Sequence, residues 1–327
     1  VLAIATAAAW FLKPSAAVEE IPNELIRVEI SAPTDAPFEL SSLHPGPATM
    51  SPDGKHVTFA ARGEDGRDLL WVRSLSDEAA RPLSGTDGAG YPFWSPDSRS
   101  IGFFAQGMLK KVDITGAPPF SISTARVGKG GSWNSDDVII FAPTFNGPLL
   151  RVSAAGGEAD TVTAINSAAS ENSHRFPSFL PDGNHFLFFV RTSAQTQNES
   201  SIWLGALDGS VSKRLFTCRS QAEYAMGHIL YVRDGTLMGR PFDADLLEFT
   251  GDPFAIADLT DAYKQNGALR VRRGIKLAAR RALLVQDELT LNAPSEVWWF
   301  LHTQAVIDVA PGGRTATLSQ EGKQVQV

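Results

Sequence analysis

Short apolar segments alternate with polar, glycine- and proline-rich turns along most of the chain. Several of these segments are apolar at every position rather than at every second one, and they lie at residues 57–60, 101–104, 138–141, 186–190 and 229–232. A strand of this kind needs cover on both faces of its sheet. The pattern therefore predicts many short buried strands in sheets that are stacked on one another.

One turn motif precedes these segments and returns about every 45 residues. In this motif proline presets φ, aspartate bonds the backbone two residues on, and glycine accepts a positive φ. The copies are Ser51-Pro52-Asp53-Gly54, Ser95-Pro96-Asp97-Ser98 and Leu180-Pro181-Asp182-Gly183, with altered copies at 134–137 and 226–228. The aspartates resemble those of an Asp-box glycosidase, but their position between two strands favours a structural role in the turn.

Each repeat contains the parts of one propeller blade. A bulky residue (Met50, Trp94, Trp133 or Leu180) anchors an inner strand before the turn, the apolar strand follows, and a third strand and a short outer strand complete the unit. A period of 40 to 50 residues built from short strands is typical of a β-propeller. The sequence predicts an all-β propeller of four-stranded antiparallel blades, with about six blades and the start of a seventh.

The first residues form an apolar run that ends in Trp10, Phe11 and Lys13. We interpret residues 1–13 as the C-terminal part of a transmembrane helix, because aromatic residues and lysine gather at the membrane interface. A signal-peptide core is the competing interpretation. Residues 14–24 are predicted to be a linker, and their shortage of basic residues favours the non-cytoplasmic side.

The predicted propeller occupies residues 25–327 and is incomplete. Residues 25–30 alternate apolar and polar, as expected of an outer strand that closes the ring or of a linker strand. Residues 258–327 are poorly patterned, and the stretch 268–282 is strongly basic where inner strands are expected. A patch for an anionic partner and local damage to the sequence both account for that stretch, so it carries no functional weight.

Composition excludes several classes of function. The net charge of −7 does not favour nucleic acid, and the single Cys218 excludes an intramolecular disulfide and a cysteine-based metal site. The segment 130–134 departs from a nucleophile elbow at Asn134, where glycine is required. The six histidines form no chelating pattern. We therefore predict no catalytic residue, metal or cofactor in this chain.

Two segments lead into inner strands and provide the candidate ligand contacts. They are Gly90-Tyr91-Pro92-Phe93 and His174-Arg175-Phe176-Pro177. Residues at such positions lie near the mouth of a propeller's central channel, where ligands often bind. Tyr91, Glu171, His174 and Arg175 are therefore predicted to contact an unidentified protein or small-molecule ligand.

Residues 48–257 resemble the TolB-like, WD-repeat-like propellers. More narrowly, the chain is similar to the propeller that follows the single transmembrane helix of bacterial eukaryotic-like serine/threonine protein kinases. The residues that carry the resemblance are Tyr91-Pro92-Phe93-Trp94-Ser95-Pro96-Asp97-Ser98, then 99–104 and 109–113, Ser173-His174-Arg175-Phe176-Pro177, then 178–183, and 235–243. Residues 258–327 depart from the family pattern.

The resemblance implies a non-catalytic sensor or protein-interaction propeller in a single-pass protein of a bacterial membrane. The propeller would be periplasmic or otherwise extracytoplasmic, and the kinase domain would lie upstream of Val1. Two alternatives remain. One is the propeller of a prolyl-oligopeptidase-type serine peptidase, and the other is a free-standing TolB-like periplasmic scaffold.

Overall fold

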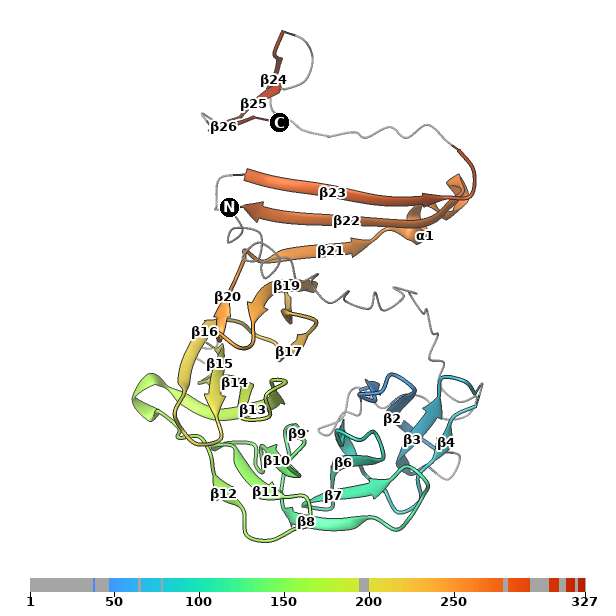
Figure 1. Ribbon diagram of the computed structural model, residues 1–327, viewed down its shortest axis with the longest axis vertical. Coiled ribbons are helices and arrows are strands. Elements are labelled where there is room, and N and C mark those ends of the chain that lie inside the picture. The colour runs from blue at the N-terminus through green and yellow to red at the C-terminus, as the bar shows by residue number, and fades with distance from the viewer. Residues whose placement is uncertain are drawn as a thin grey trace, which may run out of the picture. The chain divides into compact units, whose positions relative to one another are not determined.

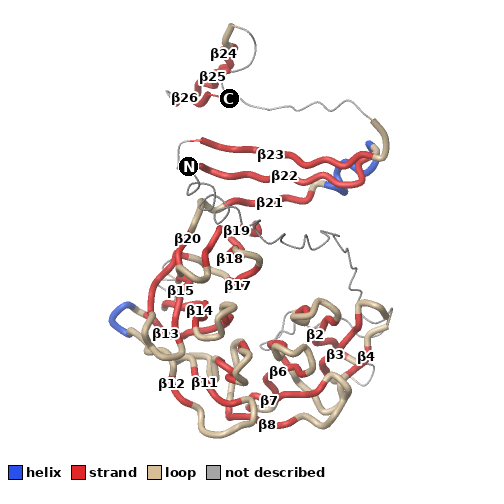
Figure 2. Tube along the Cα trace, viewed as in Figure 1, coloured by secondary structure: helices blue, strands red, loops and turns tan. Residues whose placement is uncertain are grey.

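The computed structural model describes Phe38 and residues 47–63, 66–77, 79–193, 200–278, 282–294, 306–311, 316–320 and 323–326 (Figures 1 and 2). These residues belong to two units, Val1–Phe254 and Ala255–Val327, each of which is described by itself. The predicted membrane helix, the linker and the strand at 25–30 lie outside the described residues. Within the described part, no helix has the length and apolar character needed to cross a bilayer.

Four antiparallel sheets of four strands follow one another in the first unit, and we call them blades 1 to 4. In each blade the strands pair in chain order, from the inner strand to the outer one. Blade 1 contains β1 (Thr49–Met50), β2 (His56–Arg62), β3 (Asp68–Ser74) and β4 (Arg81–Pro82); blade 2 contains β5 (Gly90–Trp94), β6 (Ser100–Ala105), β7 (Met108–Asp113) and β8 (Phe120–Thr124). Blade 3 contains β9 (Gly131–Trp133), β10 (Val138–Phe141), β11 (Leu150–Ser153) and β12 (Asp160–Thr161); blade 4 contains β13 (Glu171–Phe179), β14 (His185–Thr192), β15 (Ser201–Ala206) and β16 (Ser212–Thr217).

The fifth blade, blade 5, is built from strands that pair in chain order like those of blades 1 to 4. Its strands are β17 (Ala222–Ala225), β18 (His228–Arg233), β19 (Thr236–Asp243) and β20 (Glu248–Phe249), joined in that order by antiparallel pairing. A short 3₁₀ helix, η1 (Ser167–Ala169), precedes blade 4, and β21 (Phe254–Asp258) follows blade 5. The repeated four-stranded sheets confirm the predicted propeller architecture for this part of the chain.

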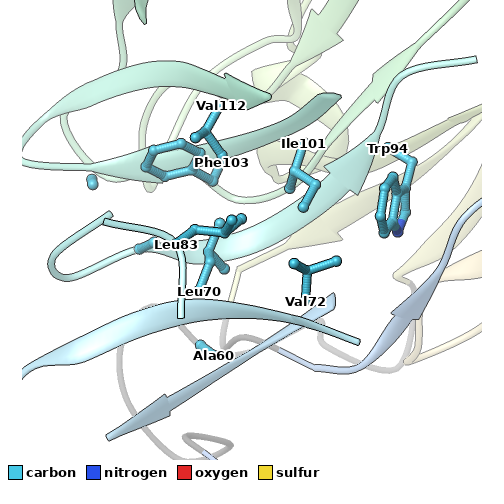
Figure 3. Packing of buried hydrophobic residues seen from close by; sticks show 10 residues of the cluster. Ala60, Leu70, Val72, Leu83, Trp94, Ile101, Phe103 and Val112 are labelled. Carbon is cyan, nitrogen blue, oxygen red and sulfur yellow. The ribbon is translucent and has the colours of Figure 1, made fainter. Parts of the chain in front are cut away.

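The blades pack face to face through the apolar strands. Between blades 1 and 2, Leu70 and Val72 of β3 meet Ile101 and Phe103 of β6, all buried, with Trp94 at the inner end (Figure 3). The second strands of blades 2, 3 and 4 are thus covered on both faces by neighbouring blades. This packing explains why these strands are apolar at every position.

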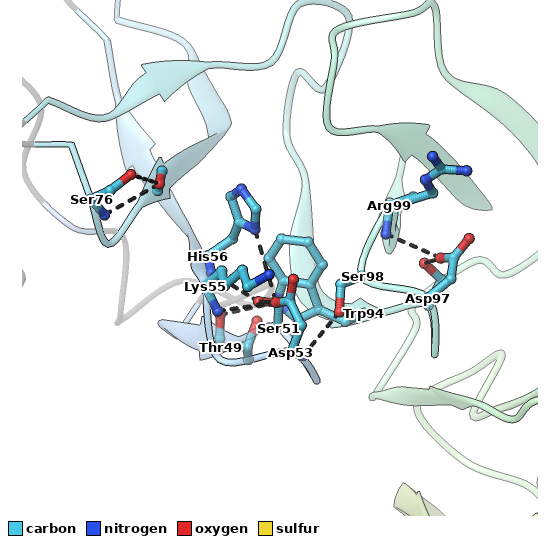
Figure 4. A network of polar contacts seen from close by, with 12 residues as sticks. Thr49, Ser51, Asp53, Lys55, His56, Ser76, Trp94, Asp97, Ser98 and Arg99 are labelled. Carbon is cyan, nitrogen blue, oxygen red and sulfur yellow. Dashed lines mark hydrogen bonds and ion pairs between the residues drawn. The ribbon is translucent and has the colours of Figure 1, made fainter. Parts of the chain in front are cut away.

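The turn motif stabilises its own hairpin. In blade 2 the Ser95 hydroxyl donates to Asp97 Oδ1 (2.6 Å), the same oxygen accepts the Arg99 N–H (3.0 Å), and Ser95 Oγ accepts the Ser100 N–H (2.9 Å). Ser51 and Asp53 make the equivalent bonds in blade 1 (Figure 4). These contacts support the structural role predicted for the motif.

Blade 3 forms the turn with a different residue. Asn134 stands where the other turns have serine, and its Oδ1 accepts the N–H groups of Asp136 (3.1 Å) and Val138 (2.9 Å). One asparagine side chain therefore replaces both the serine and the aspartate of the motif, which explains why the altered copy at 134–137 still forms a blade.

The second unit differs from the prediction of a sixth blade. After α1 (Thr260–Tyr263) and the 3₁₀ helix η3 (Lys264–Asn266), the chain forms a long hairpin of β22 (Ala268–Ala278) and β23 (Ala282–Leu291). A separate sheet contains β24 (Val306–Val309), β25 (Ala316–Gln320) and β26 (Lys323–Gln326).

The described residues of the basic stretch, 268–278 and 282, belong to this hairpin. Arg273 forms a two-bond ion pair with Asp287 of the facing strand (2.8 Å for each bond), and Arg270 lies 3.8 Å from Glu288. Cross-strand pairing of opposite charges stabilises this two-stranded register. Within the described residues of this unit, no four-stranded sheet is present.

Candidate ligand-binding cavity

The inner strands of all five blades line one cavity in the first unit, of about 760 Å³, which we call the axial cavity. The inner strands contact one another in the order β1, β5, β9, β13 and β17. The wall is rich in aromatic rings, among them Tyr91, Trp94, Trp133, Phe176 and Tyr224. A concave wall that combines aromatic rings with polar groups is typical of a ligand site.

Tyr91 and Phe176 occupy equivalent positions in blades 2 and 4. Each has a φ of +50°, each is followed by proline, and each lies where the inner strand bulges away from its neighbour. Their ring centroids are 5.9 Å apart. Positive φ is costly for an aromatic residue and is found where the surrounding structure imposes it, often at a binding site. Bulges serve to redirect side chains at such places.

Three cations gather around one phenyl ring beside Tyr91. The guanidinium carbons of Arg175 and Arg191 lie 4.7 and 5.7 Å from the centre of the Phe145 ring, and Lys129 Nζ lies 5.9 Å from it. Lys129 Nζ also donates to the Tyr91 hydroxyl (3.3 Å). We call Lys129, Arg175 and Arg191 the cationic cluster.

Arg175 is held in place by neighbouring oxygens. Its Nε–H donates to Ser173 Oγ and its Nη2–H donates to the Phe145 carbonyl, both at 2.7 Å. Lys129 and Arg175 are both buried. Burial lowers the pKa of Lys129, and the charge of Arg175 lowers that pKa further. Burial also raises the pKa of Tyr91, against the opposing effect of Arg175.

A carboxylate lies elsewhere on the cavity wall. Ser178 of blade 4 donates its hydroxyl hydrogen to Glu223 Oε2 of blade 5 (2.7 Å). The Glu223 side chain is open to the cavity, and protein atoms surround it on the other sides. The resulting loss of bulk water raises the pKa of Glu223, whereas the hydrogen bond from Ser178 lowers it. The cavity therefore presents an anionic group as well as aromatic rings.

His174 and Glu171 lie in a second cavity, of about 360 Å³, which also involves Thr163, Phe188 and Trp203. His174 Nδ1 is 2.7 Å from Thr163 Oγ1, and His174 Nε2 is 3.4 Å from Glu171 Oε2. Burial lowers the pKa of His174, opposed by the hydrogen bond and charge of Glu171. The four predicted contact residues thus fall into two pairs, Tyr91 with Arg175 and His174 with Glu171.

Sequence reasoning missed four residues of these sites: Lys129, Phe145, Arg191 and Glu223. Lys129 and Phe145 lie in connecting segments without a repeated motif, and Arg191 resembles an ordinary strand end. Glu223 had a usable signal, since it stands 45 residues after Ser178 and so occupies the same position in the next blade.

Four residues of the turn motif contribute to the wall of the axial cavity: Pro52, Pro96, Pro181 and Gly183. In the described part of the chain, no group of three or more histidine, cysteine or acidic residues is placed to hold a metal ion.

Several solved structures resemble the chain. A putative TolB from Agrobacterium tumefaciens is 16% identical, with 75% of this chain and 81% of that one covered and a TM-score of 0.45. TolB from Acinetobacter baumannii is 15% identical, with coverages of 61% and 52% and a TM-score of 0.49. The propeller domain of the Trilobed protease from Pyrococcus furiosus is 15% identical, with coverages of 76% and 84% and a TM-score of 0.46.

No protein-family model matches the chain, and no curated protein matches it in sequence. The TolB-like propeller implied by the family resemblance is confirmed at the level of the fold by the repeated four-stranded antiparallel sheets. Similarity at these values says nothing about function. The association with a kinase stays a prediction.

Proposed function

We propose that this chain is a non-catalytic sensor or protein-interaction propeller that binds its ligand in the axial cavity. The observation that carries the proposal is the pair of strained aromatic residues, Tyr91 and Phe176, which bulges place at the cavity wall. Holding the backbone of both residues at positive φ costs free energy, on the order of 1–3 kcal/mol for each residue. A binding role explains why the chain retains this cost in two blades.

The proposal extends to the parent protein. The apolar run at 1–13 and its acidic flank support a single membrane crossing with the propeller on the extracytoplasmic side. The resemblance to receptor-like kinases supports a serine/threonine kinase domain upstream of Val1. Ligand binding would control such a kinase by favouring one arrangement of the helix or of a dimer over another.

The first test is the coding sequence on both sides of this chain. A kinase domain that leads into a completed membrane helix before Val1 supports the proposal. A hydrolase domain with a nucleophile elbow after Val327 would make the chain a peptidase propeller. A short leader and an immediate start codon would make it a free-standing scaffold.

The second test measures signalling in the full-length parent, reconstituted in liposomes. Tyr91→Ala removes one ring of the cavity and is expected to change how extracytoplasmic extract alters kinase autophosphorylation. Phe120→Ala is the matched control, because Phe120 is a half-exposed aromatic residue on the outer strand β8. Equal responses in the wild type and both variants would contradict a role for the axial cavity.

A further inference from the structure

We infer that the cationic cluster of Lys129, Arg175 and Arg191 binds the carboxylate of an amphipathic ligand whose apolar part enters the axial cavity. This inference rests on the proposed function, because it names the chemistry of the ligand for that cavity.

The three cations are close together, and two of them are largely removed from water. Lys129 and Arg175 are only 5% and 9% exposed. Lys129 and Arg175 both lie over the ring of Phe145. Arg191, on strand β14, lies over the same ring. Like charges that share a dry site raise each other's free energy.

Two of these cations are not neutralised within the described chain. Arg175 bonds to a hydroxyl and a carbonyl, and Arg191 Nη1 lies 3.4 Å from the side-chain oxygen of Asn172. Neither forms an ion pair with an acidic side chain in the part of the chain that the structure describes. The pKa of Arg175 is lowered by its burial and by the charge of Arg191, in agreement with this accumulation of charge. A bound carboxylate would relieve the repulsion.

The aromatic contacts determine the rest of the ligand. Tyr91 joins the cluster to the axial cavity, because its hydroxyl accepts from Lys129 while its ring faces Phe176 and belongs to the cavity wall. A ligand whose carboxylate lies beside Lys129 therefore meets the rings of Tyr91 and Phe176 with its next atoms. A carboxylate on an aromatic or aliphatic body fits this order of groups.

The geometry favours a carboxylate over a larger polyanion. Two of the nitrogens of Arg175, Nε and Nη2, are already engaged, so the guanidinium does not offer its full fork to a ligand. Lys129 acts as a point charge. A compact monoanion matches the one Arg175 nitrogen, Nη1, that hydrogen-bonded oxygens of the described chain leave open, together with the positive charge of the cluster.

The probe is 3-phenylpropionate, and its neutral isostere 3-phenylpropanamide is the comparison. Binding to the whole 327-residue chain is measured by isothermal titration and by saturation-transfer NMR. We expect the acid to bind in a saturable manner and the amide about tenfold more weakly or worse, since a hydrogen bond between charged groups contributes about one such factor or more.

Lys129→Met and Arg191→Met each remove one charge while keeping an unbranched side chain. Each is expected to weaken the acid about tenfold and the amide by much less, because only the acid carries the charge that pairs with the cluster. Arg240→Met is the matched control. Arg240 also lies over an aromatic ring, 3.7 Å from the centre of Phe249, and it bonds to the Gly251 carbonyl, but it is outside the cluster. Thermal unfolding of each variant verifies that it is folded.

Equal binding of acid and amide, no saturable binding of the acid up to its solubility, or equal losses in Arg240→Met and the cluster variants would each overturn the inference. Failure of the proposed function has a different signature. If the acid binds and the cluster variants weaken it, but the parent kinase does not respond to Tyr91→Ala, the carboxylate site stands and the sensor role falls.

Discussion

The indole N–H of Trp94 donates to the carbonyl oxygen of Thr49 at 3.0 Å, and the two residues are 45 positions apart in the chain. The same separation joins the Asp53 N–H to Ser98 Oγ (3.1 Å) and Ser178 Oγ to Glu223 (2.7 Å). This number matches the period of the turn motif. Hydrogen bonds between neighbouring blades therefore join residues that lie at the same level of each blade, and they fix one blade against the next (Figure 4).

We expect Trp94→Phe to lower the free energy of unfolding by about 1–2 kcal/mol, because it removes the hydrogen bond to Thr49 and some buried ring volume. Urea unfolding measures the change. Trp203→Phe is the control for indole loss, since its N–H bonds within its own strand, to Ser201. A Trp94→Phe protein as stable as the wild type would show that the contact between blades is not stabilising.

Gly102→Ala is expected to destabilise the chain by about 1–3 kcal/mol through overpacking. A Cβ atom at this position would lie 2.3 Å from Cζ of Phe93, and the same ring is also 2.6 Å from the Cβ position of Gly131 in the next blade. Because the Phe93 ring packs against both glycines, it cannot move away from a new Cβ atom at Gly102 without pressing on Gly131.

Gly274→Ala is the matched control, because the nearest atom to its Cβ position is 3.7 Å away. Thermal unfolding of both variants is the measurement. Equal midpoints would mean that the Phe93 ring moves aside without cost.

The turn aspartates predict a loss of stability in acid. The bond from the Ser95 hydroxyl lowers the pKa of Asp97 below its usual 3.8. Because the folded pKa is depressed, this contribution is fully present above about pH 4 and is lost as the pH falls through the folded value. Asp97→Asn keeps an acceptor oxygen and removes the titration.

The difference in unfolding free energy between the wild type and Asp97→Asn should therefore shrink as the pH falls below 3.8. NMR titration of Asp97 in a Ser95→Ala protein should show its pKa moving up towards the usual value. Parallel pH profiles for the wild type and Asp97→Asn would exclude this linkage.

The raised pKa of Glu223 predicts the opposite dependence of stability on pH. Its pKa is raised above 4.5 by the surrounding protein, so its contribution is fully present below pH 4.5 and is lost as the pH rises through the folded value. Glu223→Gln should therefore unfold at a higher temperature than the wild type at neutral pH, with the advantage disappearing in acid. The effect is small, because the side chain is open to the cavity.

Calorimetry at several pH values tests this prediction. Ser178→Ala is the companion variant, since loss of the hydroxyl bond that favours the carboxylate should raise the pKa of Glu223 further. A Glu223→Gln protein that is less stable than the wild type at neutral pH would show that the ionised carboxylate has stabilising partners.

The candidate site was only partly predictable. Tyr91 and Arg175 were found because their segments lead into inner strands, and both lie at the cationic cluster. His174 and Arg175 are adjacent in sequence but reach different sites, the second cavity and the cationic cluster, because successive side chains in a strand point to opposite faces. The sequence around Lys129 and Arg191 contains no motif that predicts their contact with Phe145.

The sequence by itself determined the blades of the first unit, because turns and apolar strands depend on contacts within a few residues, such as the bonds of Ser95 to Asp97 and Ser100. It did not predict the hairpin of β22 and β23, where two long strands pair with each other in place of the expected blade. Only the tertiary structure decided the cavities and the cationic cluster. These sites join residues from different blades and connecting segments, and their proximity depends on how one blade packs against the next.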